Sequence, residues 1–154
     1  MDINLREAHE KDLPELLALY GQLGQDDGSV LSLEEAQRIF ARFKSYPYYR
    51  LYVAELDDRL IGTFALLIMD NLGHLGTPTA ILEDVVVDET LRGQGIGKRM
   101  MNYANDLCRQ AGCYKMTFSS NMNRETAHRF YESLGFRRHG YSFYINYDQS
   151  LAEG

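Results

Sequence analysis

Cysteine is scarce in this chain of 154 residues, which contains only Cys108 and Cys113. Two cysteines at this spacing, with no second pair and no clustered histidine, match neither a disulfide framework nor a zinc site. We therefore interpret both as packed thiols and expect no metal cofactor.

Long apolar runs and export signals are also missing. No stretch is apolar enough to cross a bilayer, and residues 1–6 lack the basic and apolar regions of a signal peptide. These absences predict a cytoplasmic protein with no membrane partner. A basic surplus is absent as well, because 16 Lys and Arg stand against 22 Asp and Glu, for a formal charge of -6. Since this charge repels a phosphate backbone, we expect no nucleic-acid partner and favour a cationic or amine substrate.

The length fits a single domain with one core, so residues 1–154 are expected to form one domain with residues 148–154 as a frayed tail. Residues 3–6 are typical of a strand. The sequence Asp12-Leu13-Pro14-Glu15 predicts a capping box that begins a helix, and Ser32-Leu33-Glu34-Glu35 predicts a second one, with a helix that ends before Pro47. Residues 49–56 and 60–69 predict a hairpin.

The second half of the chain alternates strands and helices. Residues 80–87 predict a buried strand that carries Glu83 and Asp84, which point to opposite faces if the strand is regular. Further helices are expected over residues 96–111 and from an asparagine cap at Asn121 or Asn123 to Gly135. Residues 114–119 and 141–147 predict the last two strands. The pattern favours a mixed α/β sheet.

A glycine-rich turn, Arg92-Gly93-Gln94-Gly95-Ile96-Gly97, joins the buried strand to the next helix. Backbone N–H groups at such a helix N-terminus bind anions, and the helix dipole adds to the attraction. A P-loop requires Gly-Lys followed by Ser or Thr, which this turn lacks. A dinucleotide fingerprint read from Gly93 requires glycine where this chain has Lys98. Neither of these two phosphate motifs fits.

The turn resembles the acetyl-CoA pyrophosphate loop of the GNAT superfamily of N-acetyltransferases: Gln or Arg, two residues, Gly, one residue, then Gly or Ala. Residues 82–88 resemble the family's fourth strand, and residues 127–136 resemble its fourth helix and the strand that follows. With residues 3–12, the resemblance covers nearly the whole chain. It implies a central, mostly antiparallel sheet of six to seven strands, splayed between strands 4 and 5 and flanked by about four helices.

The resemblance also implies a site for acetyl-CoA as co-substrate. Pantetheine would pair with the backbone of Val85 and Val87, and an N–H near Val86 would polarise the thioester carbonyl. The glycine turn and Lys98 would bind the pyrophosphate. The expected acetyl-CoA contacts are Val85, Val86, Val87, Arg92, Gly93, Gln94, Gly95, Ile96, Gly97, Lys98, Asn123 and His128. For His128 the alternative is a solvated histidine, and the family's usual asparagine position holds Arg124 here.

Catalytic roles follow from the same resemblance. Tyr131 matches the helix tyrosine that reprotonates the CoA thiolate, although such a residue can also be an ordinary core tyrosine. Glu83 matches the family's acidic position, as a general base or as a group that binds the amine's ammonium form. Asp84 is a second substrate-binding candidate. Structural pairing of these carboxylates is the alternative.

The expected reaction is transfer of an acetyl group from acetyl-CoA to a primary amine of a small molecule. Residues 119–136 are similar to aminoalkylphosphonate acetyltransferases, and residues 82–87 to glucosamine-phosphate acetyltransferases. Acetylation of a protein or peptide amine and a catalytically silent CoA-binding domain are the alternatives. Residues 23–32 and 70–79 are expected to shape the choice of acceptor. A homodimer is the expected assembly.

Overall fold

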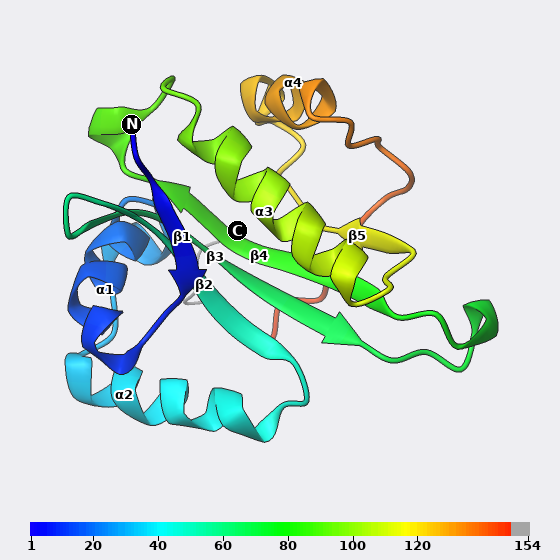
Figure 1. Ribbon diagram of the computed structural model, residues 1–154, viewed down its shortest axis with the longest axis horizontal. Coiled ribbons are helices and arrows are strands. Elements are labelled where there is room, and N and C mark those ends of the chain that lie inside the picture. The colour runs from blue at the N-terminus through cyan, green and yellow to red at the C-terminus, as the bar shows by residue number, and fades with distance from the viewer. Residues whose placement is uncertain (149–154) are drawn as a thin grey trace.

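The computed structural model describes residues 1–148, in which a five-stranded sheet has helices on both faces (Figure 1). The strands lie in chain order, with β1 to β4 antiparallel to their neighbours and β5 parallel to β4. Their bounds are Asn4–Glu7 (β1), Tyr49–Leu56 (β2), Arg59–Met69 (β3), Thr79–Val87 (β4) and Lys115–Thr117 (β5). The mixed sheet confirms the expected fold class. Except for Asp148, the expected tail lies outside the described residues.

Helices α1 (Leu13–Gly21) and α2 (Leu33–Arg42) cover one face of the sheet. The cap of α2 is as predicted, because the Ser32 hydroxyl accepts from the Glu35 N–H at 3.2 Å. The predicted cap of α1 is wrong. The Asp12 carboxylate accepts instead from the His9 N–H and from Arg6, each at 2.7 Å. Its hydrogen bonds therefore go to residues that precede α1 and not to the first N–H groups of that helix.

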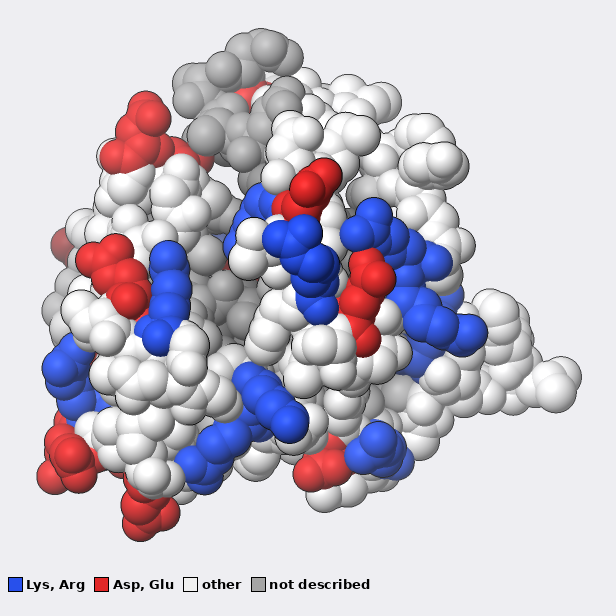
Figure 2. Space-filling view, turned by 90° about the horizontal axis from the view of Figure 1, so that it is seen from above, with Lys and Arg blue, Asp and Glu red and all other residues white. Residues whose placement is uncertain are grey.

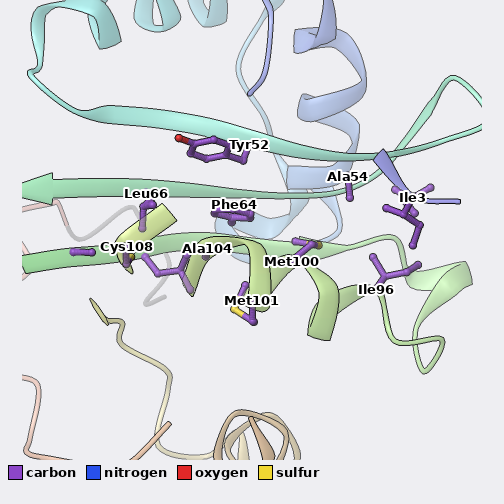
Figure 3. Packing of buried hydrophobic residues seen from close by; sticks show 13 residues of the cluster. Ile3, Tyr52, Ala54, Phe64, Leu66, Ile96, Met100, Met101, Ala104 and Cys108 are labelled. Atoms are coloured by element: carbon purple, nitrogen blue, oxygen red, sulfur yellow. The ribbon is translucent and has the colours of Figure 1, made fainter. Parts of the chain in front are cut away.

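Helix α3 (Ile96–Gln110) crosses the other face. Figure 3 shows Met100 and Ala104 of α3 beside Phe64 of β3, which stacks on Tyr52 of β2 at 5.2 Å between ring centroids. Each of these side chains is buried. The sheet therefore separates two apolar clusters, one under α3 and one under α1 and α2.

Helix α4 (Glu125–Ser133) lies beside the N-terminal half of α3 (Figure 1). It ends at Gly135, whose φ of 94° confirms the expected left-handed stop. The predicted asparagine cap is wrong. Arg124 occupies the cap position without a side-chain hydrogen bond, and the Asn121 side chain instead accepts from the Asn123 N–H, closing the turn before the helix.

The sheet has fewer strands than the six to seven expected. Residues 141–147 form no strand in the described part of the chain, and their aromatic side chains are exposed. Strand β5 has three residues and pairs only with Thr79, Ala80 and Ile81, so it offers a short ladder for a further strand to extend. Within residues 1–148, no helix has both the length and the apolar character needed to span a membrane.

Candidate active site

Strand β4 contains a bulge at the two residues between Glu83 and Val86. Thr63 of β3 pairs with Val86 and Ala65 pairs with Glu83, so Phe64 alone faces Asp84 and Val85. Asp84 has a φ of 51°, in the left-handed region that non-glycine residues rarely adopt. Such strain persists only where the surrounding structure enforces it, and it is frequent at functional sites.

The bulge reverses which face of the sheet each later side chain meets. Leu82 packs into the cluster under α3, and after the extra residue Val85 and Val87 pack there too. Val86 belongs to the cluster under α1 and α2. A regular strand would place Val85 and Val87 opposite to Leu82. Strand β4 therefore presents different side chains to the two faces than its sequence alone indicates.

Glu83 and Asp84 do not point to opposite faces, because the strand is not regular. Both carboxylates act electrostatically on Tyr49, which packs in the cluster under α1 and α2. Both side chains reach solvent, yet the surrounding protein desolvates them and raises both pKa values. For Glu83 the charge of Asp84 raises the pKa further. The pair forms an acidic group on the α1–α2 side of β4.

This acidic group borders a cavity of about 370 Å³ between α1, α2 and β4. Asp84 lines it, together with side chains of Tyr20, Tyr49 and Asp26. Residues 23–32 contribute much of its wall. Residues 70–79, expected with residues 23–32 to shape the choice of acceptor, are not among the described residues that line it.

The glycine turn lies on the far side of β4 and is held by Asp88. This buried carboxylate accepts from the Thr90 hydroxyl at 2.7 Å, from the Thr90 N–H at 2.9 Å and from Arg59 at 2.8 Å, and these bonds lower its pKa. Gly93 and Gly95 have φ values of 80° and 81°. A Cβ on either would meet nothing within 4 Å, so the backbone faces open space.

The N-terminus of α3 leaves donors directed at that space. The first bond within the helix joins the Arg99 N–H to the Gly95 carbonyl at 3.2 Å. The N–H groups of Ile96, Gly97 and Lys98 therefore have no acceptor inside the helix. Open glycine backbone and unpaired N–H groups form the kind of cradle that a pyrophosphate requires.

The sheet is splayed between β4 and β5, as expected. Their pairing ends at Ile81 and Thr117, so the backbone of β4 from Leu82 to Val87 has no strand beside it on that edge within residues 1–148. The backbone of Val85, Val86 and Val87 is thus left without a β5 partner. A thin, extended ligand can pair with such an edge.

Helix α4 brings Tyr131 close to the glycine turn. A Cβ on Gly97 would lie 3.1 Å from the Phe130 ring and 3.8 Å from Val87, so Gly97 lies close to both side chains. The Tyr131 ring is 5.5 Å from that of Phe130 and 4.4 Å from that of Phe118, centroid to centroid. Burial among these rings raises the pKa of Tyr131. A neutral phenol therefore lies beside Phe118, the residue that follows β5.

Two other predicted contacts lie on the α4 segment. The His128 ring nitrogen is 3.2 Å from the Ser120 hydroxyl, and the side chain of Asn123 is exposed. In the view from above, Lys and Arg side chains border a hollow in the surface (Figure 2). Asp and Glu side chains stand among these basic ones (Figure 2), and the glycine turn and α4 lie on the side of the molecule that this view faces (Figure 1).

The sequence matches the Acetyltransferase (GNAT) family over residues 13–136. The chain belongs to the GNAT acetyltransferase family. It is 32% identical to a glucosamine 6-phosphate N-acetyltransferase of Trypanosoma brucei brucei, over 90% of this chain and 92% of the relative. It is 28% identical to an aminoalkylphosphonate N-acetyltransferase of Salmonella typhimurium, over 90% and 88%.

Solved structures agree with this assignment. A Trypanosoma brucei acetyltransferase superposes with a TM-score of 0.82 at 31% identity, covering 94% of this GNAT chain and 99% of that one. The glucosamine-6-phosphate N-acetyltransferase of Arabidopsis thaliana has the same fold, with a TM-score of 0.82 at 24% identity over 96% and 100%. The GNAT enzyme described here is thus an acetyl-CoA-dependent N-acetyltransferase.

Sequence reasoning did not identify Tyr20, Tyr49 and Asp26 as residues of the site. The sequence predicts Tyr20 only as one member of the apolar stripe of α1, and Tyr49 only as the first residue of a strand. The shared feature is their position on the cavity wall, which depends on how α1, α2 and β4 pack together. No local pattern encodes that packing.

Proposed function

We propose that this enzyme transfers the acetyl group directly from acetyl-CoA to a primary amine of a small molecule, with donor and acceptor meeting across β4. The observation that carries the proposal is the bulge, which turns Val85 and Val87 toward the glycine-turn side and Asp84 into the opposite cavity. The names of the relatives, which specify small amines, support the acceptor class.

Acetyl-CoA would supply an activated thioester, and the chain offers a fit for each of its parts. The residues from Arg92 to Lys98 would bind the pyrophosphate at the N-terminus of α3. The open edge at Val85 and Val87 would hold the pantetheine, and a donor near Val86 would stabilise the charge that develops on the carbonyl oxygen. His128 and Asn123 would be outer contacts.

Direct transfer is favoured because neither cysteine is suited to carry the acetyl group. Burial raises the pKa of Cys108 to about 12 and raises that of Cys113 as well. Since the thiolate is the nucleophilic form, both thiols are poor nucleophiles at neutral pH. The amine itself is therefore the attacking group.

Glu83 would act as the general base. An amine attacks only in its neutral form, so a carboxylate must accept the proton that the ammonium loses. The raised pKa of Glu83 brings it closer to that of the amine and makes it a better acceptor than an ordinary glutamate. Tyr131 would donate a proton to the departing thiolate, because burial keeps its hydroxyl protonated.

Thermal unfolding with ligands tests the donor site. Acetyl-CoA or CoA at 100 times its dissociation constant is expected to stabilise the protein by about 2.7 kcal/mol, and NAD and ATP are not expected to match this. A screen of amines with acetyl-CoA, scored by release of free thiol, then tests turnover. A CoA-dependent shift without turnover on any amine, including peptide amines, would indicate a silent CoA-binding domain.

A further inference from the structure

The cavity beside Asp84 has an apolar wall and a negative charge. Most of its lining consists of aliphatic and aromatic side chains, from α1, α2 and the segment between them. Its carboxylates are Asp26 and Asp84, and Glu83 adds a third negative charge near Tyr49. Among the described residues that line it, none is Lys, Arg or His.

Two cationic side chains line a separate cavity next to this one. Lys44 and Arg50 line a neighbouring cavity of about 580 Å³. Phe43 and Tyr49 line both cavities, and their rings stack at 4.3 Å, so they form part of the wall between them. The Arg50 guanidinium lies over the Tyr48 ring at 4.3 Å and 3.8 Å from Glu7. Arg50 is thus engaged on its own side of the wall.

We propose that the acceptor is a primary amine on an apolar body without a phosphate or phosphonate group, and that Asp84 binds its ammonium form. This inference rests on the proposed function and separates the enzyme from relatives named for glucosamine 6-phosphate and aminoalkylphosphonate. Those names specify an anionic group on the acceptor. Within residues 1–148, the lining of the cavity beside Asp84 offers no cation to balance one.

Charge and burial favour the same acceptor. An anionic group in this cavity would lose its hydration and meet Asp84 and Asp26 with no compensating cation, which is how a site rejects a competitor. An aliphatic or aromatic body would remove the apolar walls from water at no such cost. The left-handed Asp84 at the bulge holds its carboxylate at the cavity, where it can bind an ammonium group.

The transfer step balances with these groups. Asp84 binds the ammonium, one proton passes from nitrogen to Glu83 and then to solvent, and the neutral nitrogen forms a bond to the carbonyl carbon. The carbon–sulfur bond breaks, the nitrogen releases its second proton to solvent, and the thiolate receives a proton from Tyr131, which regains one from solvent. The products are the N-acetyl amine and free CoA.

The test compares two acceptor classes in the intact protein. 2-Phenylethylamine and hexylamine are the apolar amines, and glucosamine 6-phosphate and 2-aminoethylphosphonate are the anionic ones. With acetyl-CoA saturating, kcat/KM is expected to be at least about 10²-fold higher for the apolar amines, a tenfold ratio being about 1.4 kcal/mol. Equal or better activity on the anionic acceptors overturns the proposal.

The stabilisation of the protein by CoA in thermal unfolding distinguishes failure of the acceptor proposal from failure of the proposed function. If CoA stabilises the protein and the apolar amines are not acetylated, the acceptor proposal is wrong while the donor site stands. If CoA gives no shift, the proposed function itself fails.

Two variants test the assigned charge. Asp84→Asn keeps the side-chain size and is expected to raise KM for 2-phenylethylamine about tenfold or more while the CoA shift remains. Lys44→Ala, in the neighbouring cavity, is expected to change neither amine class. Unchanged KM in Asp84→Asn overturns the role of Asp84, and a loss of activity on glucosamine 6-phosphate in Lys44→Ala would show that anionic acceptors bind across the wall.

Discussion

Tyr131 is half-buried among Phe118, Phe130 and Phe136, and its pKa is raised, so it keeps its proton at neutral pH. If it protonates the thiolate, Tyr131→Phe removes the proton and keeps the packing. We expect the rate of acetyl transfer to fall by roughly 10² to 10⁴. Pre-steady-state measurement is required, because slow product release can hide a chemical defect.

The matched control for this change is Tyr103→Phe on α3. Tyr103 is also half-buried with a raised pKa, and it packs edge-on against Tyr52 at 5.8 Å between centroids. Its loss is expected to leave transfer unchanged. If Tyr131→Phe transfers as fast as the parent, another group or water protonates the thiolate, and Tyr131 has a packing role only.

At the residue scale, Glu83 also predicts how kcat/KM depends on pH. Its pKa is raised by burial and by the charge of Asp84. As a base it acts only when deprotonated, so kcat/KM is expected to fall as pH decreases through this raised pKa. Asp84→Asn removes the second cause, and the acidic limb is expected to move to lower pH. The measurement is the pH profile of kcat/KM in both proteins.

Glu83→Gln is the companion variant. It is expected to lower turnover more than CoA binding and to abolish the acidic limb that Glu83 produces. If the acidic limb of the pH profile stays at the same pH in Asp84→Asn and in Glu83→Gln, a group other than Glu83 produces that limb. Normal turnover with a lower melting temperature would make Glu83 a structural residue.

At the scale of elements, a substitution at the glycine that precedes α3 can be compared with the same substitution at a glycine that follows α3. Gly95 and Gly112 both have left-handed φ values, 81° and 77°, with no atom within 4 Å of a built Cβ. Asparagine tolerates this conformation better than most residues. Gly95→Asn is expected to abolish the stabilisation by CoA because its side chain fills the cradle, whereas Gly112→Asn is expected to keep it. Equal CoA affinity in both would remove the turn from the donor site.

Most elements could be predicted because their signals are local. The apolar stripe of α3, the cap at Ser32 and the glycine turn at Gly93 and Gly95 are all encoded within a few residues, and the structure places them where expected. The stop of α4 at Gly135 follows from the same kind of signal. The roles assigned to site residues remain predictions.

The wrong predictions concern features that depend on a partner outside the element itself. The Asp12 carboxylate binds Arg6 in place of capping α1, and the bulge at Asp84 depends on how β4 pairs with β3. Residues 141–147 have the composition of a strand, yet β5 is too short to extend a ladder to them. The pairing of β4 with β3 depends on the whole sheet, and Arg6 lies in a different element from the helix that Asp12 precedes, so the pattern within one element could not specify either contact.

At the scale of the whole molecule, Arg6 ties β1 to β2 and to the start of α1. It binds Asp12 at 2.7 Å and Glu55 at 2.7 Å, and Asp12 is the most buried of the three side chains. Asp12→Asn is expected to lower the free energy of unfolding by about 1.5 to 3 kcal/mol at pH 7, the range for a hydrogen bond to a charged group. Urea unfolding at several pH values measures this.

The pH dependence has a definite sign. The bond from Arg6, more than any other cause, lowers the pKa of Asp12 in the folded protein below its ordinary 3.8. The contribution of the Asp12 carboxylate to the free energy of unfolding is therefore complete above pH 3.8. It is lost as pH falls through the lower pKa that Asp12 has in the folded protein. The difference between parent and Asp12→Asn should shrink only in that acidic window. The exposed pair Arg138–Glu132 is the control, and Glu132→Gln is expected to change stability by less than about 0.5 kcal/mol.

The bulge in β4 also sets which changes this chain can accept in the course of evolution. Substitutions at Glu83 or Asp84 alter the acceptor side and leave the facing of Val85 and Val87 intact, so acceptor preference can drift one residue at a time. Loss of a single codon at this point has a different effect. It removes the extra residue together with the bulge, so the strand returns to regular alternation with Val85 and Val87 still facing the cluster of Leu82, but the acceptor side loses one of its two carboxylates and the left-handed turn that holds them. A change of length at this position therefore alters the acceptor side while the later part of the strand keeps its packing.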